Sequence, residues 1–236
     1  RIRGKGRVER LAPLGSFAIR ALQRWLKKRS LAVDQRGDEG TPVFVNRFGR
    51  RLSSRSAEPL KSRERTCGGS FIRIGRAIGI EERAVGATLS GAVCVNLLRH
   101  PAWGRAQETY GEDPYLLGEI GAALSEGIQE HNVISTVKHF ALNSIENSRF
   151  QVDIQVGERV MREVYLPHFK RILDSGCASV MSAYNKVNGD YCGHSKHLLR
   201  DILKDEWGFK GFVHSDWVKG AYGPDAAEAG LDVENP

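Results

Sequence analysis

Short apolar runs and helical patterns alternate along the chain from about residue 75 onward. The apolar runs lie at residues 92–97, 133–137, 178–183, 211–214 and 230–233, and the helical patterns lie at 114–129, 158–173 and 196–206. Strand and helix patterns repeated in this order are typical of a parallel sheet with crossover helices. The sequence therefore predicts an α/β fold for this region.

The first 66 residues have a different pattern. Two short strands are expected around a Gly-Lys-Gly turn at Lys5, and Ser16 then precedes an apolar stripe at helical spacing over residues 19–26. Another strand and turn are expected in PVFVNRFGRRLS. Residues 57–69 are charged and lack periodicity, so we expect a short α+β segment at 1–66 and a second domain at 67–236.

Polar side chains follow several of the apolar runs in the second region. Lys138 and His139 follow VISTV, Tyr184 follows ASVMSA, and Asp216 and Trp217 follow GFVHS. In parallel α/β sheets, and above all in (β/α)8 barrels, the carboxyl ends of the strands form the active-site face. We therefore expect these groups to converge on one pocket, and such a set of polar groups suits a polyhydroxylated ligand.

Charge is distributed unevenly between the two regions. Residues 1–66 carry 18 Lys and Arg against 6 Asp and Glu, whereas residues 67–236 carry 17 against 22. This asymmetry indicates two origins or two tasks rather than one basic surface. The four cysteines show no metal-ligand spacing, so we interpret them as reduced thiols and expect neither a metal nor a cofactor.

We expect a cytoplasmic location and no membrane association, because neither a signal peptide nor a membrane span is evident. The chain opens on Arg1 without an initiator Met, which suggests either a trimmed start or a partial sequence.

From about residue 75 to its end, the chain resembles the β-glucosidase branch of family 3 glycoside hydrolases. The resemblance is carried by RHPAWGRAQETYGEDPYLLGEIG, TVKHFALNSIENSRF, ERVMREVYLPHFK, VMSAYNKVNG, GFVHSDW and AGLDVENP, in family order. It implies a partial or rebuilt (β/α)8 TIM-like barrel with Asp216 as the catalytic nucleophile. It also implies that a glucose subsite is lined by Arg105, Lys138, His139, Met181 and Tyr184, and Trp217 could offer a flat apolar face to a sugar ring.

Each of these residues also has a structural interpretation. Asp216 could cap a following helix, and Lys138-His139 could be a solvated lysine beside a core histidine. Arg105 could pair with Glu108 or Glu112 on a loop. Of Met181 and Tyr184, one is expected to face the core.

Residues 1–56 resemble part of the catalytic domain of Xer-type tyrosine recombinases, in which Lys5 would match the hairpin lysine. Residues 1–66 contain no Tyr and no His, so the DNA-attacking nucleophile and the His-x-x-Arg element of that family are missing. The resemblance therefore does not predict a recombinase. We interpret the chain as the product of a chimeric or rearranged gene, with a basic segment in place of the first barrel strands.

The sequence thus predicts a retaining β-glucosidase that acts on terminal β-D-glucosyl residues of β-glucosides or short β-linked gluco-oligosaccharides. The general acid/base implied by the resemblance is a glutamate in a downstream domain, so weak or absent activity is also consistent with the sequence. Two alternatives stay open: a non-catalytic sugar-binding barrel remnant, and a DNA-binding fragment at residues 1–66, although nucleic acid is not the expected partner. The open edges of a partial barrel predict association between copies.

Overall fold

The computed structural model describes residues 2–3, 9–10, 67–218 and 223–235 of the 236-residue chain. The chain divides into two units, Arg1–Pro59 and Leu60–Pro236. In the first unit, strand β1 (Ile2–Arg3) pairs antiparallel with β2 (Glu9–Arg10). The two short strands expected around the Gly-Lys-Gly turn are therefore present. The turn at Lys5, the helical stripe at 19–26 and the strand in PVFVNRFGRRLS lie outside the described residues.

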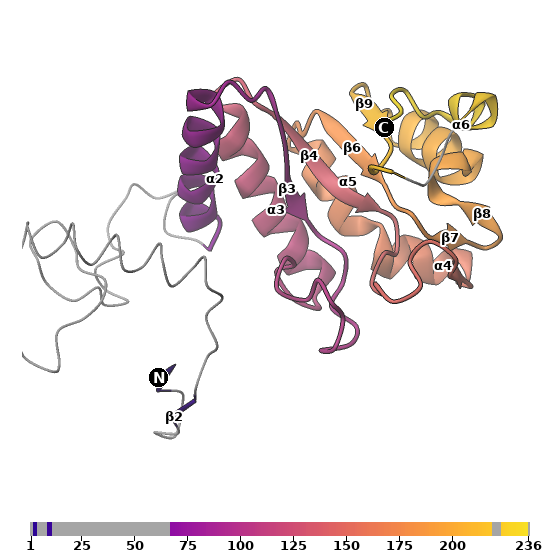
Figure 1. Cartoon of the computed structure of the whole chain (residues 1–236), viewed down its shortest axis with the longest axis horizontal. Helices are drawn as coiled ribbons and strands as arrows, with labels where there is room; N and C mark the ends of the chain where they lie inside the picture. Colours follow the sequence, from indigo (N-terminus) through magenta and orange to yellow (C-terminus); the bar gives the residue numbers. More distant parts are fainter. Residues whose placement is uncertain (1, 4–8, 11–66, 219–222, 236) are drawn as a thin grey trace, which may run out of the picture. The chain divides into compact units, whose positions relative to one another are not determined.

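A four-stranded parallel sheet forms the centre of the second unit (Figure 1). Its strands are β3 (Leu89–Cys94), β4 (Ile134–Phe140), β6 (Ser179–Ser182) and β9 (Phe212–His214), in the order β3-β4-β6-β9. All three pairings are parallel, which confirms the expected α/β fold with crossover helices. A small second sheet joins β5 (Asp153–Ile154), β7 (Lys186–Val187) and β8 (Asp190–Tyr191).

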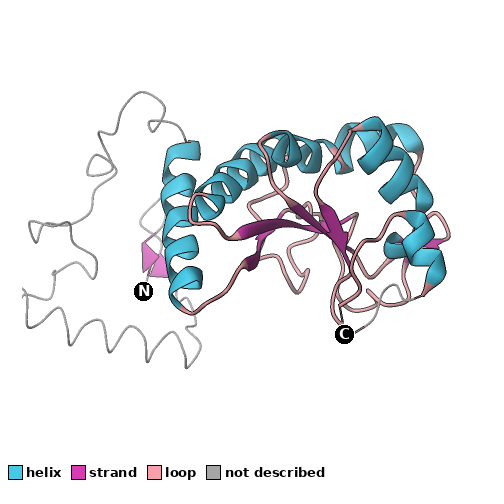
Figure 2. Ribbon diagram, turned by 90° about the horizontal axis from the view of Figure 1, so that it is seen from above, coloured by secondary structure: helices cyan, strands magenta, loops and turns pink. Residues whose placement is uncertain are grey.

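Helices form an arc along one side of the large sheet (Figure 2). Helix α2 (Cys67–Ala84) precedes β3, and α3 (Pro114–Gln129) connects β3 to β4. Between β4 and β6 lie α4 (Glu158–Val160), the π-helical turn η2 (Met161–Tyr165) and α5 (Pro167–Asp174). The 3₁₀ turn η3 (Cys192–His194) and the π-helix η4 (His197–Glu206) lead to β9. Helix α6 (Pro224–Ala229) follows β9.

Helix α3 has the bounds that its sequence pattern predicts. Its N-cap residue, Asp113, and its first residue, Pro114, both favour the start of a helix. The side chain of Asp113 accepts a hydrogen bond of 2.9 Å from the backbone N–H of Leu116, and Pro114 occupies the first turn. An aspartate cap and a proline at this place satisfy or remove backbone donors that have no partner inside the helix. The helix buries ten of its residues against the sheet and α2.

Helix α2 is a correction to the sequence interpretation, which placed the domain boundary in the aperiodic residues 57–69 and assigned no helix to residues 67–84. Four glycines in CGGSFIRIGRAIGIEERA lower its helix propensity. Two of them are needed for packing against α3. A Cβ at Gly75 would lie 2.3 Å from the carbonyl oxygen of Leu124, and one at Gly79 would lie 2.8 Å from that of Ile128.

The expected helix at 158–173 is also corrected, because it is interrupted before Pro167. Proline has no backbone N–H and its ring clashes with the preceding turn of a regular helix. The chain accommodates it through a wide turn in which the N–H of Leu166 donates to the carbonyl oxygen of Met161 at 3.0 Å. The strand expected at 230–233 is reduced to a single bridge between His214 and Val233, because Gly230 ends α6 in the left-handed conformation.

The hydrophobic core lies between the sheet and the helices. Phe140 of β4 is fully buried, and its ring meets Phe169 edge-on at 5.2 Å and Trp207 at 6.0 Å between ring centroids. Burying each such side chain contributes about 1.5–3 kcal/mol to folding. Because Phe140 ends β4, this packing fixes the end of the strand that carries Lys138 and His139. Within the described residues no helix is long and apolar enough to cross a membrane.

Candidate active site

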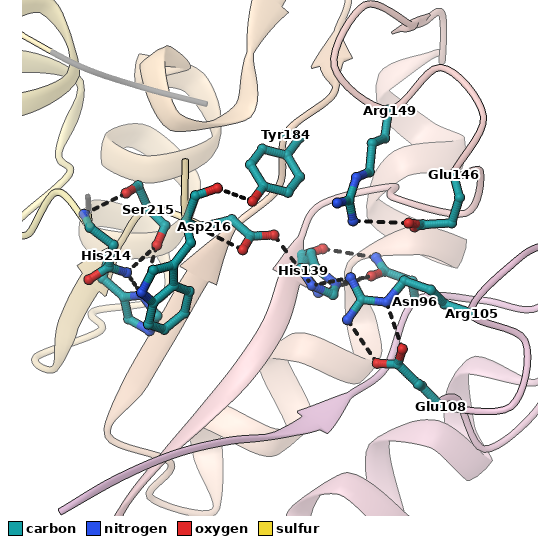
Figure 3. A network of polar contacts seen from close by, with 12 residues as sticks. Asn96, Arg105, Glu108, His139, Glu146, Arg149, Tyr184, His214, Ser215 and Asp216 are labelled. Carbon is teal, nitrogen blue, oxygen red and sulfur yellow. Dashed lines mark hydrogen bonds and ion pairs between the residues drawn. The ribbon is translucent and has the colours of Figure 1, made fainter. Parts of the chain in front are cut away.

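Polar side chains gather at the carboxyl-terminal edge of the large sheet (Figure 3). Asn96 follows β3 by two residues, Tyr184 follows β6 by two, and Asp216 follows β9 by two. Lys138 and His139 belong to β4 itself, which runs through Phe140. The expectation that β4 ends before Lys138 was therefore wrong, and the reason is that the strand continues until Phe140 reaches the core. Because the strands are parallel, all these groups meet at one edge.

Asp216 projects toward the imidazole of His139 in the centre of this cluster (Figure 3). Its Oδ2 atom lies 3.6 Å from Nε2 of His139, and its Oδ1 atom accepts a hydrogen bond of 2.8 Å from the backbone N–H of Trp217. The Asp216 side chain is 13% exposed, so one carboxylate oxygen is held by backbone while the other faces the cluster. No described helix begins directly after Asp216, so the helix-cap interpretation of this residue does not apply within the described part of the chain.

His139 is a neutral imidazole. Burial lowers its pKa well below the ordinary histidine value, and the nearby charges of Arg105, Lys138 and Arg149 lower it further. The short distance to Asp216 is therefore not an ion pair, since an ion pair requires a protonated ring. Nη1 of Arg105 lies 2.8 Å from Nε2 of His139, so the guanidinium donates to this ring nitrogen.

Arg105 connects the cluster to Glu108. Its Nε and Nη2 atoms donate to the two carboxylate oxygens of Glu108 at 3.0 and 2.8 Å. This double hydrogen bond, reinforced by the charge of Arg105, holds the pKa of Glu108 below its ordinary value against the opposing effect of burial. The expected ion pair between Arg105 and Glu108 on the loop is thus present. The same guanidinium also donates to His139.

Lys138 and Met181 approach each other beside Gly91 of β3. A Cβ at Gly91 would lie 3.8 Å from Nζ of Lys138 and 3.8 Å from Cε of Met181. The charge of Lys138 also lowers the pKa of His214, for which burial is the main cause. Lys138 is therefore close to the cluster and is only partly buried, whereas Met181 is buried.

Tyr184 links the end of β6 to the segment after β9. It is 4% exposed, and its hydroxyl donates to the backbone carbonyl of Trp217. The Trp217 indole is 44% exposed and meets the ring of His214 edge-on, with centroids 5.9 Å apart. We expected one of Met181 and Tyr184 to face the core. The structure buries both side chains.

Arg149 is a member of the site that the sequence interpretation did not single out. Its guanidinium lies over the rings of Phe150 and Tyr184, at 4.9 and 4.8 Å from their centroids, and it pairs with Glu146 at 2.9 Å. The two rings are themselves only 4.7 Å apart between centroids, so the cation lies against a pair of adjoining aromatic rings, to which it is attracted electrostatically. The available signal was its position inside TVKHFALNSIENSRF, only ten residues after His139.

Within the described residues no group of three or more His, Cys, Asp or Glu side chains could hold a metal ion. Cys94, Cys177 and Cys192 are buried reduced thiols. Burial raises the pKa of Cys94 to about 11 even though Arg105 and Lys138 lie nearby, so it is not a nucleophile near neutral pH. Asp216 presents its carboxylate oxygen Oδ2 to this cluster.

A parallel α/β domain with a carboxylate and several cations near the strand ends has its polar groups where α/β enzymes carry their active sites. Residues 61–231 match the family model of the glycosyl hydrolase family 3 N-terminal domain, so the chain belongs to this family. Beta-glucosidase B of Emericella nidulans is 44% identical over 164 residues, which is 69% of this chain and 19% of that protein. The beta-glucosidase of Kluyveromyces marxianus is 42% identical over 164 residues, with the same shares of each chain.

The solved structures agree with this assignment. Beta-glucosidase 3B from Thermotoga neapolitana in complex with glucose superimposes with a TM-score of 0.68 at 42% identity, over 70% of this chain and 23% of that one. The beta-glucosidase from Kluyveromyces marxianus in complex with glucose gives a TM-score of 0.70 at 38% identity, over 72% of this chain and 20% of that one. The chain spans about a fifth of the length of the curated relatives that it matches.

Proposed function

We propose that this chain supplies the nucleophile and the glucose-binding side of a retaining β-glucosidase site, built on part of a (β/α)8 barrel. The observation that carries the proposal is the position of Asp216, whose Oδ2 lies 3.6 Å from Nε2 of His139 at the carboxyl-terminal edge of the sheet, where Arg105 contacts the same ring nitrogen. It is supported by relatives that are named beta-glucosidases and by solved neighbours in complex with glucose.

In the proposed reaction, Oδ2 of Asp216 attacks the anomeric carbon of a β-glucoside. A bond forms between this oxygen and the carbon, the bond from the carbon to the aglycone oxygen breaks, and a carboxylic acid protonates the departing oxygen. Water then attacks the anomeric carbon, gives its proton to the conjugate base of that acid, and breaks the bond to Asp216, so that glucose leaves and the carboxylate returns. Trp217 N–H stabilises the other carboxylate oxygen throughout, since it binds Oδ1 at 2.8 Å.

The proton donor is the second requirement of this mechanism. Glu108 and Glu146 are the carboxylates bound to the site arginines, and each is engaged in an ion pair. The family resemblance instead implies a glutamate from a further domain, and we assign the acid step to such a group. Arg105, Lys138, His139, Met181, Tyr184 and Trp217 are proposed to line the subsite for the terminal glucose.

The decisive experiment uses a dinitrophenyl 2-deoxy-2-fluoro-β-glucoside, whose leaving group needs little acid assistance. Mass spectrometry of the treated 236-residue chain should find one fluoroglucosyl adduct on the peptide that carries Asp216. Asp216→Asn should abolish the adduct, whereas Asp190→Asn, an exposed aspartate on β8, should leave it unchanged. A folded wild-type chain that forms no adduct would contradict the proposed glycosidase activity and favour a sugar-binding module without turnover. Titration with glucose would then detect that binding.

Residues 1–66 support a second candidate, nucleic-acid binding, through their surplus of 18 basic over 6 acidic residues. Binding of this kind is electrostatic and weakens steeply with salt. Filter binding to duplex DNA across a salt series tests it, and absence of retention at low salt would exclude it. The resemblance of residues 1–56 to Xer-type recombinases stays a prediction from the sequence.

A further inference from the structure

The side chain of Asn96 makes three polar contacts with His139. It lies two residues after β3 and is 1% exposed. Its Oδ1 atom accepts a hydrogen bond of 2.9 Å from the backbone N–H of His139, and its Nδ2 atom donates to the backbone carbonyl of His139 at 2.8 Å. The same Oδ1 atom lies 3.2 Å from Nδ1 of the His139 ring. Figure 3 shows this amide beside the imidazole.

These contacts fix which nitrogen of the ring carries the proton. The two backbone bonds set the orientation of the amide, because a flipped amide would place its NH2 against an N–H donor. Oδ1 can only accept, so Nδ1 must donate to it. On the other side of the ring, Arg105 has donors and no acceptor, and its Nη1 lies 2.8 Å from Nε2. Nε2 must therefore be unprotonated, and both sides of the ring require the same tautomer.

The tautomer matters for Asp216, whose Oδ2 lies 3.6 Å from Nε2. With the proton on Nδ1, the imidazole presents a lone pair and cannot donate to this carboxylate. The opposite tautomer would bring a donor toward Oδ2 and would place an N–H against the guanidinium of Arg105. A donor there would stabilise the carboxylate and weaken it as a nucleophile.

We propose that Asn96 is a positioning residue that holds His139 as the Nδ1–H tautomer, so that Nε2 accepts from Arg105 and Asp216 receives no proton from the imidazole. The consequence for catalysis rests on the proposed function. The tautomer itself does not, because it follows from contacts among Asn96, His139 and Arg105 alone.

The first test is nitrogen NMR of the full chain labelled with 15N-histidine. Protonated and unprotonated ring nitrogens of a neutral imidazole have well-separated shifts, and His139→Gln identifies the His139 signals by their loss. We expect a protonated Nδ1 and an unprotonated Nε2 at pH 7. A protonated Nε2 in the wild-type chain would overturn the proposal, whether or not the chain hydrolyses a glucoside.

The second test compares variants at position 96. Asn96→Asp keeps an acceptor opposite Nδ1 and adds a negative charge, so Nδ1–H should persist and His139 should titrate about one pH unit higher. The cations Arg105, Lys138 and Arg149 and the carboxylate of Asp216 face the ring in both proteins. Asn96→Ala removes the acceptor opposite Nδ1, so Arg105 alone holds the tautomer and the Nε2–H form should gain population relative to the wild-type chain. If Asn96→Ala does not fold, Asn96→Asp alone tests the proposal. A His139 titration in Asn96→Asp that is unchanged from the wild-type chain would then overturn it.

Asn188 provides a matched control. It holds Val156 in the same way, with Oδ1 accepting from the backbone N–H and Nδ2 donating to the carbonyl, both at 2.9 Å. Asn188→Asp should leave the His139 signals at their wild-type shifts. In the fluoroglucoside assay, Asn96→Ala should slow adduct formation at saturating reagent at least about tenfold, whereas Asn188→Asp should not. An Asn96→Ala chain with the tautomer lost and the rate unchanged would overturn the catalytic part of the proposal.

Discussion

Nε2 of His139 lies 3.6 Å from Oδ2 of Asp216, and the two groups meet as a lone pair and a carboxylate rather than as an ion pair. Burial and the cations Arg105, Lys138 and Arg149 keep the pKa of His139 well below its ordinary value, so the ring stays neutral. The imidazole therefore donates nothing to Oδ2 of Asp216, while Oδ1 accepts a hydrogen bond of 2.8 Å from the backbone N–H of Trp217.

Removing the carboxylate should create a chemically rescuable enzyme. In Asp216→Gly, hydrolysis of dinitrophenyl β-glucoside should fall close to background, because no glycosyl ester can form. Added azide should then attack the anomeric carbon from the vacated side and yield α-glucosyl azide, which NMR identifies. Asp190→Gly is the control and should give no azide product. A rescued product of β configuration would contradict attack from the Asp216 side.

The charge of Arg105 should contribute to the neutrality of His139. Arg105→Met keeps the length of the side chain and removes its charge, so the pKa of His139 should rise, since Arg105 is the largest electrostatic contributor after burial. Arg105→Lys keeps a positive charge and should shift the pKa less. Histidine NMR titrations of both variants measure the difference. Equal titrations in the two variants would show that charge at this position does not act on His139.

His168 should make the fold sensitive to acid. It is buried, and burial lowers its pKa from 6.5 to about 3. Between these values the unfolded chain binds a proton that the folded chain does not. The contribution of His168 to the free energy of unfolding should therefore be fully present above pH 6.5 and should fall by about 1.4 kcal/mol per pH unit as the pH drops toward 3.

Urea unfolding of wild type and His168→Gln between pH 7 and pH 5 measures this contribution. The variant should lose less stability on acidification, because its side chain does not titrate. His100→Gln, at an exposed position, serves as the control and should follow the wild-type slope. Identical slopes for wild type and His168→Gln would contradict a buried neutral imidazole.

The close approach of α2 and α3 should not tolerate a methyl group. A Cβ at Gly127 would lie 2.3 Å from the carbonyl oxygen of Ile72, so Gly127→Ala should destabilise the fold by about 1–3 kcal/mol. Gly157 has no atom within 4 Å of its Cβ position and an ordinary negative φ, so Gly157→Ala should be neutral or slightly stabilising. Urea midpoints of the two variants compare them directly. A neutral Gly127→Ala would show that α2 does not pack against α3 in this way.

Local signals in the sequence predicted much of the second unit. The helical pattern at residues 114–129 gave the bounds of α3, and the apolar runs gave the four strands of the large sheet with ends shifted by up to three residues. Helix α2 was missed because its glycines are poor helix formers in isolation and are favourable only against the backbone of α3. The short strands β5, β7 and β8 were missed because two residues carry no periodicity.

The sequence by itself determined the α/β class, the family resemblance and the list of polar residues at the strand ends, because these depend on local pattern and order along the chain. The tertiary structure decided how those residues act on one another. It placed Asn96 and Arg105 on opposite sides of His139, brought Arg149 over the adjoining rings of Phe150 and Tyr184, and kept the imidazole neutral beside Asp216. Hydrogen-bond direction and desolvation depend on neighbours tens of residues away, so no local pattern could have fixed them.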